Sequence, residues 1–231
     1  MFIDPLYLLA MVPGMALSMW ASHRVKSTFR KYSEVSARSG MSGAEAARDL
    51  MRSAGISHVR VERTDGFLSD HYDPSEKVLR LSPDVYDGRS LSALGVAAHE
   101  AGHALQDATN YGPLTFRSLM VKPAGFGSQA GMYVAMAGML FQVPALTWLG
   151  IILFSAFLVF TLVTLPVEFN ASSRAVQVLV DSGMITTDEA PHTRKVLNAA
   201  ALTYVAAAVS ALLQLLYLLM RAGILGGRDE D

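Results

Sequence analysis

The sequence predicts a mostly α-helical membrane protein in which four transmembrane helices accompany a small α+β unit. Hydrophobic residues make up 52% of the 231-residue chain and charged residues only 17%, which is more apolar than an ordinary soluble domain. Four apolar runs are each about long enough to span a bilayer. The expected segments are spans at 1–22, 123–166 (two helices) and 199–221, polar segments at 23–122 and 167–198, and a tail at 222–231.

The first apolar run, from Leu6 to Ala21, follows Asp4-Pro5, which is typical of a helix start. A cleaved signal peptide is the alternative interpretation. However, a signal peptide has basic residues before its apolar region, whereas here the basic cluster comes after the run. The sequence therefore predicts a retained transmembrane helix.

Two helices are expected next. Residues 23–39 combine five basic residues with apolar residues at helical spacing, which predicts a basic amphipathic helix at the headgroups of the bilayer. Ser42 and Glu45 have the spacing of a capping box and open a short helix that ends near Gly55.

The segments 58–63 and 77–82 alternate between apolar and polar residues, and a turn-rich insert at 65–74 separates them. The period of two predicts two β-strands in a short antiparallel sheet. The second strand is the expected edge with which an extended substrate would pair through main-chain hydrogen bonds.

The next helix carries an H-E-x-x-H motif. Ser90 is its expected cap, and the alanine- and leucine-rich residues that follow are good helix formers. Residues four apart share one helix face, so His99 and His103 can bind a single metal ion. Glu100 can reach a water molecule bound to that metal. The alternative is a surface helix with two incidental histidines, but such an apolar helix gives little reason for them. We therefore predict a Zn²⁺ site.

The second and third spans are expected on either side of Pro144. The second, at 124–143, contains Gly127 and Gly131 at the four-residue spacing that lets membrane helices approach closely. The third, at 145–165, is the most hydrophobic stretch, and Pro166 is expected to end its helix.

Basic residues predict the orientation. Of 19 Lys and Arg residues, 14 lie at 23–122 and three at 166–199. The positive-inside rule assigns both segments to the cytoplasm. The metal helix then faces the cytoplasm of a multi-pass protein.

A catalytic zinc site usually has three protein ligands and one open position. The chain contains no cysteine, so the third ligand must be His, Asp or Glu. Glu168 follows a very apolar span, where an unpaired carboxylate is costly. It is therefore a candidate ligand, although pairing with Arg174 is an alternative role. Asp107 and Asp181 are the reserve candidates.

The H-E-x-x-H helix followed by Glu168-Phe169-Asn170-Ala171 resembles the gluzincin-type membrane metallopeptidases, which include the HtpX-like proteases and the CAAX prenyl endopeptidases. Further segments resemble the YugP-like neutral zinc metallopeptidases of bacterial membranes over nearly the whole chain. These segments are 43–47, 70–74, 79–82, 95–100 and 201–205.

This resemblance implies a gluzincin-like catalytic unit in a bacterial plasma membrane. It implies that His99, His103 and Glu168 are zinc ligands and that Glu100 is the catalytic base. HtpX-like proteins usually have Asp where this chain has Ser172. That Asp supports a ligand histidine in those proteins, so the departure leaves the outer partner of the histidine open in this chain. Asp107 is a candidate substitute, although a solvated helix surface is the role that its position favours.

Two further residues are candidates for stabilising the oxyanion of the tetrahedral intermediate. They are His71, whose alternative role is to organise a turn, and Arg174. The predicted function is a zinc metalloendopeptidase acting on peptide or protein substrates, including membrane proteins. A zinc-stabilised membrane scaffold is the alternative, and a transporter is less consistent with spans that lack ionisable groups. The net charge of −1 argues against nucleic acid as the main partner.

Overall fold

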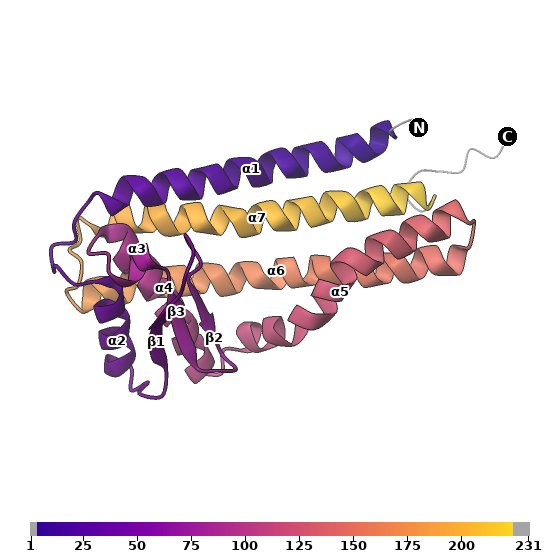
Figure 1. Ribbon diagram of the computed structural model, residues 1–231. Helices are drawn as coiled ribbons and strands as arrows, with labels where there is room; N and C mark the ends of the chain where they lie inside the picture. The colour runs from indigo at the N-terminus through magenta and orange to yellow at the C-terminus, as the bar shows by residue number, and fades with distance from the viewer. Residues whose placement is uncertain (1–3, 224–231) are drawn as a thin grey trace. The chain divides into compact units, whose positions relative to one another are not determined.

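The computed structural model describes residues 4–223, which form two compact units. The α/β unit contains residues 22–114 and 167–202, and the helical unit contains residues 4–21, 115–166 and 203–223. The helices are α1 (Pro5–Ser33), α2 (Gly43–Ser53), α3 (Pro83–Tyr86), α4 (Leu91–Ala108), α5 (Gly112–Leu140), α6 (Pro144–Asp181) and α7 (Ala190–Arg221), and the strands are β1 (Arg60–Arg63), β2 (His71–Asp73) and β3 (Val78–Leu81) (Figure 1). The first three residues of the predicted first span and residues 224–231 of the predicted tail lie outside the described residues.

The four long helices extend beyond the predicted spans: α5 begins at Gly112 and α7 at Ala190, ahead of the expected starts at 124 and 199. Helix α1 runs unbroken to Ser33, so residues 23–33 of the amphipathic helix expected at 23–39 are the second part of α1, and the prediction of helix at 34–39 is wrong. Helix α6 continues past Pro166 to Asp181, and the prediction that Pro166 ends the helix is wrong. Proline removes one backbone donor and can kink a helix, but a long apolar helix tolerates this where its neighbouring turns are held in place. As a result, Glu168 lies on α6 itself.

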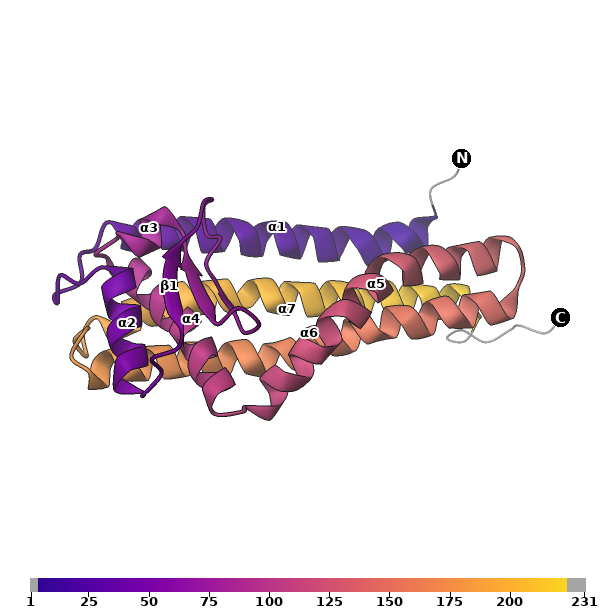
Figure 2. The ribbon, with the colours of Figure 1, turned by 60° about the horizontal axis from the view of Figure 1, so that its bottom comes forward.

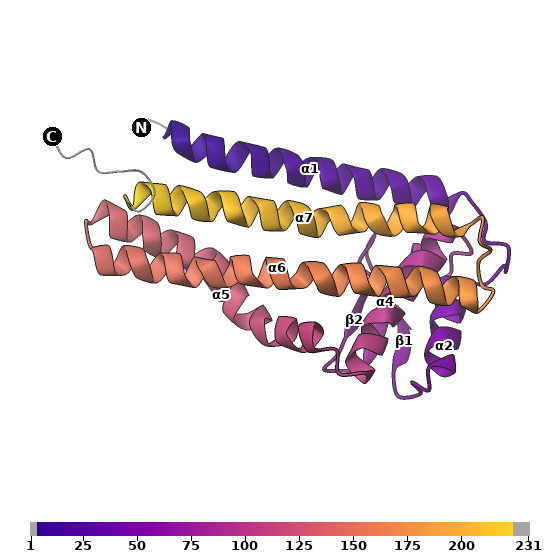
Figure 3. The same cartoon turned by 180° about the vertical axis from the view of Figure 1, so that it is seen from behind.

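Within residues 4–223, three helices are long and apolar enough to cross a membrane, namely α1, α6 and α7. Helix α5 is not among them, so the fourth predicted span stays a prediction. Within the helical unit α5 packs closely on α6 (Figure 3). A Cβ atom added to Gly127 would lie 2.2 Å from the backbone oxygen of Leu153, and one added to Gly131 would lie 2.6 Å from the nitrogen of Phe154. The close approach predicted at these two glycines is confirmed.

The sheet of the α/β unit, at the label β1 in Figure 2, has three strands in the order β1-β3-β2, which Figure 1 labels in that order. Strand β3 pairs in parallel with β1 and antiparallel with β2. The prediction of a short antiparallel sheet made of the first and last strands is therefore wrong. The connection between them is long enough to contain β2, which forms a hairpin with β3 and lets β1 and β3 run in the same direction. Strand β3 is internal, so it is not the substrate-pairing edge predicted from the sequence.

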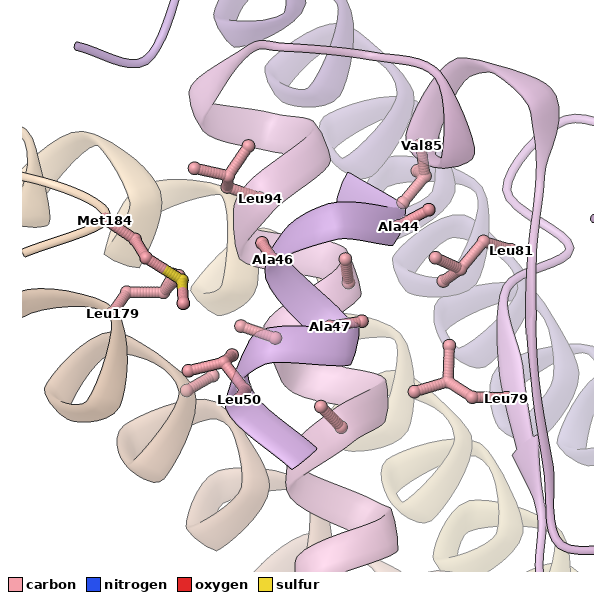
Figure 4. Close-up of a cluster of buried hydrophobic side chains, with 14 of the residues drawn as sticks. Ala44, Ala46, Ala47, Leu50, Leu79, Leu81, Val85, Leu94, Leu179 and Met184 are labelled. Carbon is pink, nitrogen blue, oxygen red and sulfur yellow. The ribbon is translucent and has the colours of Figure 1, made fainter. Parts of the chain in front are cut away.

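The core of the α/β unit lies between α2, α4, β3 and the second part of α6 (Figure 4). Helix α2 begins with the predicted capping box, in which Ser42 and Glu45 bond to each other's backbone N–H groups. Its small buried residues Ala44, Ala46 and Ala47 let α2 approach α4 closely. Leu79 and Leu81 of β3 are fully buried on the same core. This core holds the sheet and α4 in fixed positions around the site described next.

Candidate metal centre

Helix α4 presents two histidines on one face. The predicted cap is confirmed, because the Ser90 hydroxyl accepts a hydrogen bond from the Ala93 N–H at 3.2 Å. His99 and His103 are one turn apart, and their ring centres are 4.7 Å apart in an edge-to-face arrangement. The helix therefore aims two imidazole rings at one point.

Helix α6 brings Glu168 to the same point. The Oε2 atom of Glu168 lies 3.1 Å from Nε2 of His99 and 3.5 Å from Nε2 of His103. Gly102 permits this approach of the two helices, since a Cβ atom there would lie 3.1 Å from the backbone oxygen of Ala171. The side chains of His99, His103 and Glu168 expose only 12%, 9% and 2% of their surface. The structure thus brings together the three ligands predicted from the sequence.

Each histidine has a separate partner at its other ring nitrogen. Nδ1 of His99 lies 3.1 Å from the hydroxyl of Ser172. Nδ1 of His103 lies 2.9 Å from Oε1 of Gln106. An amide oxygen only accepts hydrogen bonds, so Nδ1 of His103 is the donor and its Nε2 atom is left to bind a metal. Ser172 therefore still contacts His99, a predicted ligand, although it stands where HtpX-like proteins have aspartate.

Gln106 is oriented in turn by α6. Its Nε2 atom donates to the backbone oxygen of Val167 at 3.0 Å and to Oδ1 of Asn170 at 2.9 Å. The side chain is fully buried and all its polar atoms are bonded, so it has one stable orientation. The sequence analysis missed Gln106, although its position three residues after His103 places it on the same helix face.

These residues fit a tetrahedral Zn²⁺ ion. Zinc bonds of about 2.0–2.2 Å to nitrogen and oxygen put neighbouring ligand atoms roughly 3.3–3.5 Å apart, and the two measured separations, 3.1 and 3.5 Å, are close to this value. The electrostatics also favour a cation. Burial alone would lower the pKa of His103, but its hydrogen bond to Glu168 and the charges of Glu100 and Glu168 outweigh burial and raise it. Positive charge is therefore stabilised at this point.

Glu100 follows the first histidine and is 9% exposed. Its charge acts on Asp70, a residue that precedes β2 and that was not predicted as a site residue from the sequence. Burial raises the pKa of the Asp70 carboxyl, and the nearby charge of Glu100 raises it further, while hydrogen bonds from Ser82 oppose both effects. The Asp70 carboxylate accepts the Ser82 backbone N–H at 2.7 Å and so joins the start of β2 to the end of β3. This contact holds the start of β2 near Glu100.

The other candidates lie elsewhere. His71 is exposed at the start of β2, where its Nδ1 atom contacts the backbone oxygen of Ser69 at 2.8 Å. The guanidinium of Arg174 lies 5.8 Å from the centre of the Tyr111 ring. Asp107 accepts hydrogen bonds from Tyr72 and Lys77, so it ties the sheet to α4 and does not support a ligand histidine. Asp181 is exposed at the end of α6.

We expect Gln106→Ala to lower the affinity for zinc by about 10–100-fold, the usual cost of losing a partner that orients a ligand histidine. Competition with a chromophoric chelator measures this affinity in the purified full chain. The melting temperature of the metal-free protein is measured in parallel. If zinc affinity were unchanged and only the melting temperature fell, Gln106 would contribute to packing and not to the orientation of His103. Ser172→Ala is the matched variant for the other histidine.

Comparisons with known proteins point to zinc binding. A family model described as "Putative neutral zinc metallopeptidase" matches residues 7–223. The chain is similar to a protein of Bacillus subtilis (strain 168) named "Putative membrane protease YugP". The two are 49% identical over 226 residues, which cover 98% of this chain and all of the relative. No solved structure matches the chain significantly.

Proposed function

Because this chain belongs to the neutral zinc metallopeptidase family, as its motifs suggested, we propose that it is an integral membrane endopeptidase of the gluzincin type. The observation that carries the proposal is the convergence of His99, His103 and Glu168, with Glu100 beside them. Three ligands leave one position of a tetrahedral site open, as in catalytic and not structural zinc sites.

His99, His103 and Glu168 would hold a Zn²⁺ ion, which when bound would supply a Lewis acid at the site and would lower the pKa of water to about 7. Glu100 takes a proton from the attacking water and later delivers it to the leaving amine, as a general base and then a general acid. His99 and His103 keep their Nε2 atoms toward the site because Ser172 and Gln106 hold their Nδ1 atoms. His71 and Arg174 stay proposed stabilisers of the oxyanion.

We assign the substrate-pairing edge to β2, because β3 is internal to the sheet. Strand β2 has one free edge, and the bond from Tyr72 to Asp107 joins it to the helix that carries the histidines. An extended peptide that pairs with β2 would gain main-chain hydrogen bonds and be held in one register.

Peptide cleavage by the purified full chain tests the function. Cleavage of an unstructured peptide should stop when a chelator removes the metal and return when zinc is added. A zinc-stabilised scaffold is the alternative function, and it would bind zinc without any turnover. The presence of Glu100 favours the enzyme, since a structural zinc site does not need a base.

We propose that the site faces the cytoplasm of a bacterial cell and that α5 is a fourth span beside α1, α6 and α7. The apolar helices, the name of the membrane protease relative and the positions of the basic residues support this arrangement. The packing of α5 on α6 in the helical unit supports its placement in the bilayer.

Single cysteines test this orientation, because the natural chain has none. In intact cells, cysteines at Ser57 and Asp188 should resist an impermeant thiol reagent, whereas one at Gln142, between α5 and α6, should react. All three positions are exposed in the structure. Labelling at Ser57 with protection at Gln142 would show the opposite orientation.

A further inference from the structure

A groove in the α/β unit lies between the second half of α1 and the first part of α7, which run side by side there (Figure 3). Its volume is about 550 Å³. Helix α1 contributes residues at positions i, i+3, i+4 and i+7, and so does α7, so each helix lines the groove with one face. The lining residues are Arg24, Ser27, Thr28, Lys31 and Tyr32 of α1 and Lys195, Asn198, Ala199 and Leu202 of α7.

The groove carries three positive charges and no carboxylate. Arg24, Lys31 and Lys195 line it, and within residues 4–223 none of the three forms an ion pair. Other cations of the same unit do have acidic partners, for example Arg63 with Asp87. Three neighbouring cations without counter-charges repel one another, and an anion in the groove would relieve this repulsion.

The remaining polar lining suits a phosphate group. The hydroxyl of Thr28 and the amide of Asn198 lie on the two faces that line the groove, and both can donate hydrogen bonds to phosphate oxygens. The Ser27 hydroxyl also lines the groove but donates its hydrogen to the backbone oxygen of Arg24 at 3.1 Å. Arginine and lysine are the usual charged partners of phosphate.

The neighbouring sequence indicates the source of the phosphate. The apolar run of α1 ends at Ala21, three residues before Arg24, and the apolar run of α7 begins at Ala199, within the groove lining. In a helix that spans a bilayer, this change from apolar to basic residues marks the headgroup level. Basic pockets between such helices bind the headgroups of anionic lipids.

We propose that this groove binds the phosphate of an anionic membrane phospholipid. The proposal rests on the membrane integration proposed above and not on the peptidase activity. Extraction of the chain from membranes by alkaline carbonate would refute the integration itself, so the two failures are distinguishable.

The test compares phosphatidylglycerol with phosphatidylcholine as ligands of the full chain in a non-ionic detergent, with bound lipid measured by native mass spectrometry. The triple variant Arg24→Gln, Lys31→Gln, Lys195→Gln removes the charges of the groove. The control Lys26→Gln, Arg30→Gln, Arg194→Gln removes the same charge from the same helices at exposed residues that do not line the groove. Each cation near a membrane surface contributes about fivefold in binding.

We expect wild type and control to prefer phosphatidylglycerol by about tenfold or more, and the groove variant to lose that preference. Equal weakening in both triple variants would make the attraction a general property of the basic surface and overturn the proposal. Tight binding of inorganic phosphate without discrimination between the two lipids would assign the groove to a soluble phosphate compound, which also overturns it.

Discussion

Glu100→Gln should abolish peptide cleavage and leave the zinc content of the protein close to that of wild type. An amide cannot accept the proton of the attacking water, and loss of a general base costs about 10²–10⁴-fold in rate. Glutamine has the same size as glutamate, and Glu100 is not one of the three side chains whose ligand atoms converge. Turnover of a quenched peptide and metal analysis of the same sample measure the two effects.

His103→Ala is the control for this prediction, because it removes a ligand and should lose zinc and activity together. If Glu100→Gln lost zinc as His103→Ala does, Glu100 would be a ligand or a structural residue, and the proposed mechanism would be wrong. Full activity in Glu100→Gln would mean that another residue acts as the general base.

Glu168→Ala should lower zinc affinity by at least the 10–100-fold expected from disturbing even an outer partner of a ligand. Two imidazoles would remain, and the metal would no longer join α4 to α6. The melting temperature of wild type should rise with added zinc, because a ligand that binds only the folded state stabilises it. The melting temperature of Glu168→Ala should respond little to zinc.

Arg174→Ala is the matched control on the same helix. Its guanidinium lies over Tyr111, so this variant should keep its zinc. It should do so even if its activity falls because the oxyanion is no longer stabilised. Glu168→Gln separates the two roles considered for this carboxylate. If Glu168 served only as the partner of a cation and not as a zinc ligand, the glutamine variant would keep zinc and most of its activity. Full metal content in Glu168→Ala would remove Glu168 from the ligand set.

The local features of the chain could be predicted well from its residues. The caps at Ser42 and Ser90 are confirmed, because a hydroxyl bonds to a backbone group only three residues away. The close helix approach at Gly127 and Gly131 is confirmed for a similar reason, since a missing side chain is visible in the sequence. The four-residue spacing of His99 and His103 also shows directly that a helix places both on one face.

Several features of the site depend on contacts between distant residues. Nothing near Gln106 in the sequence indicates that Val167 and Asn170 orient its amide, because those residues are about 60 positions away. Ser172 looked like the loss of a partner, yet α6 places its hydroxyl beside His99. The sequence pattern identified a side chain's chemistry at each position but not its neighbours.

The sequence by itself determined three apolar helices, the helix caps and the placement of His99 and His103 on one helix face, since each rests on residue type or on spacing within one helix. It left Glu168 as one of several candidate carboxylates, and the packing of α6 on α4 brings Glu168 to the two histidines. Only the tertiary structure decided the strand order, the continuation of α6 through Pro166 and the convergence of three cations from α1 and α7. The physical reason is the separation along the sequence of the residues that contact one another. Helix periodicity and capping come from hydrogen bonds within four residues, whereas strand order and site assembly depend on packing between segments that are far apart in the chain.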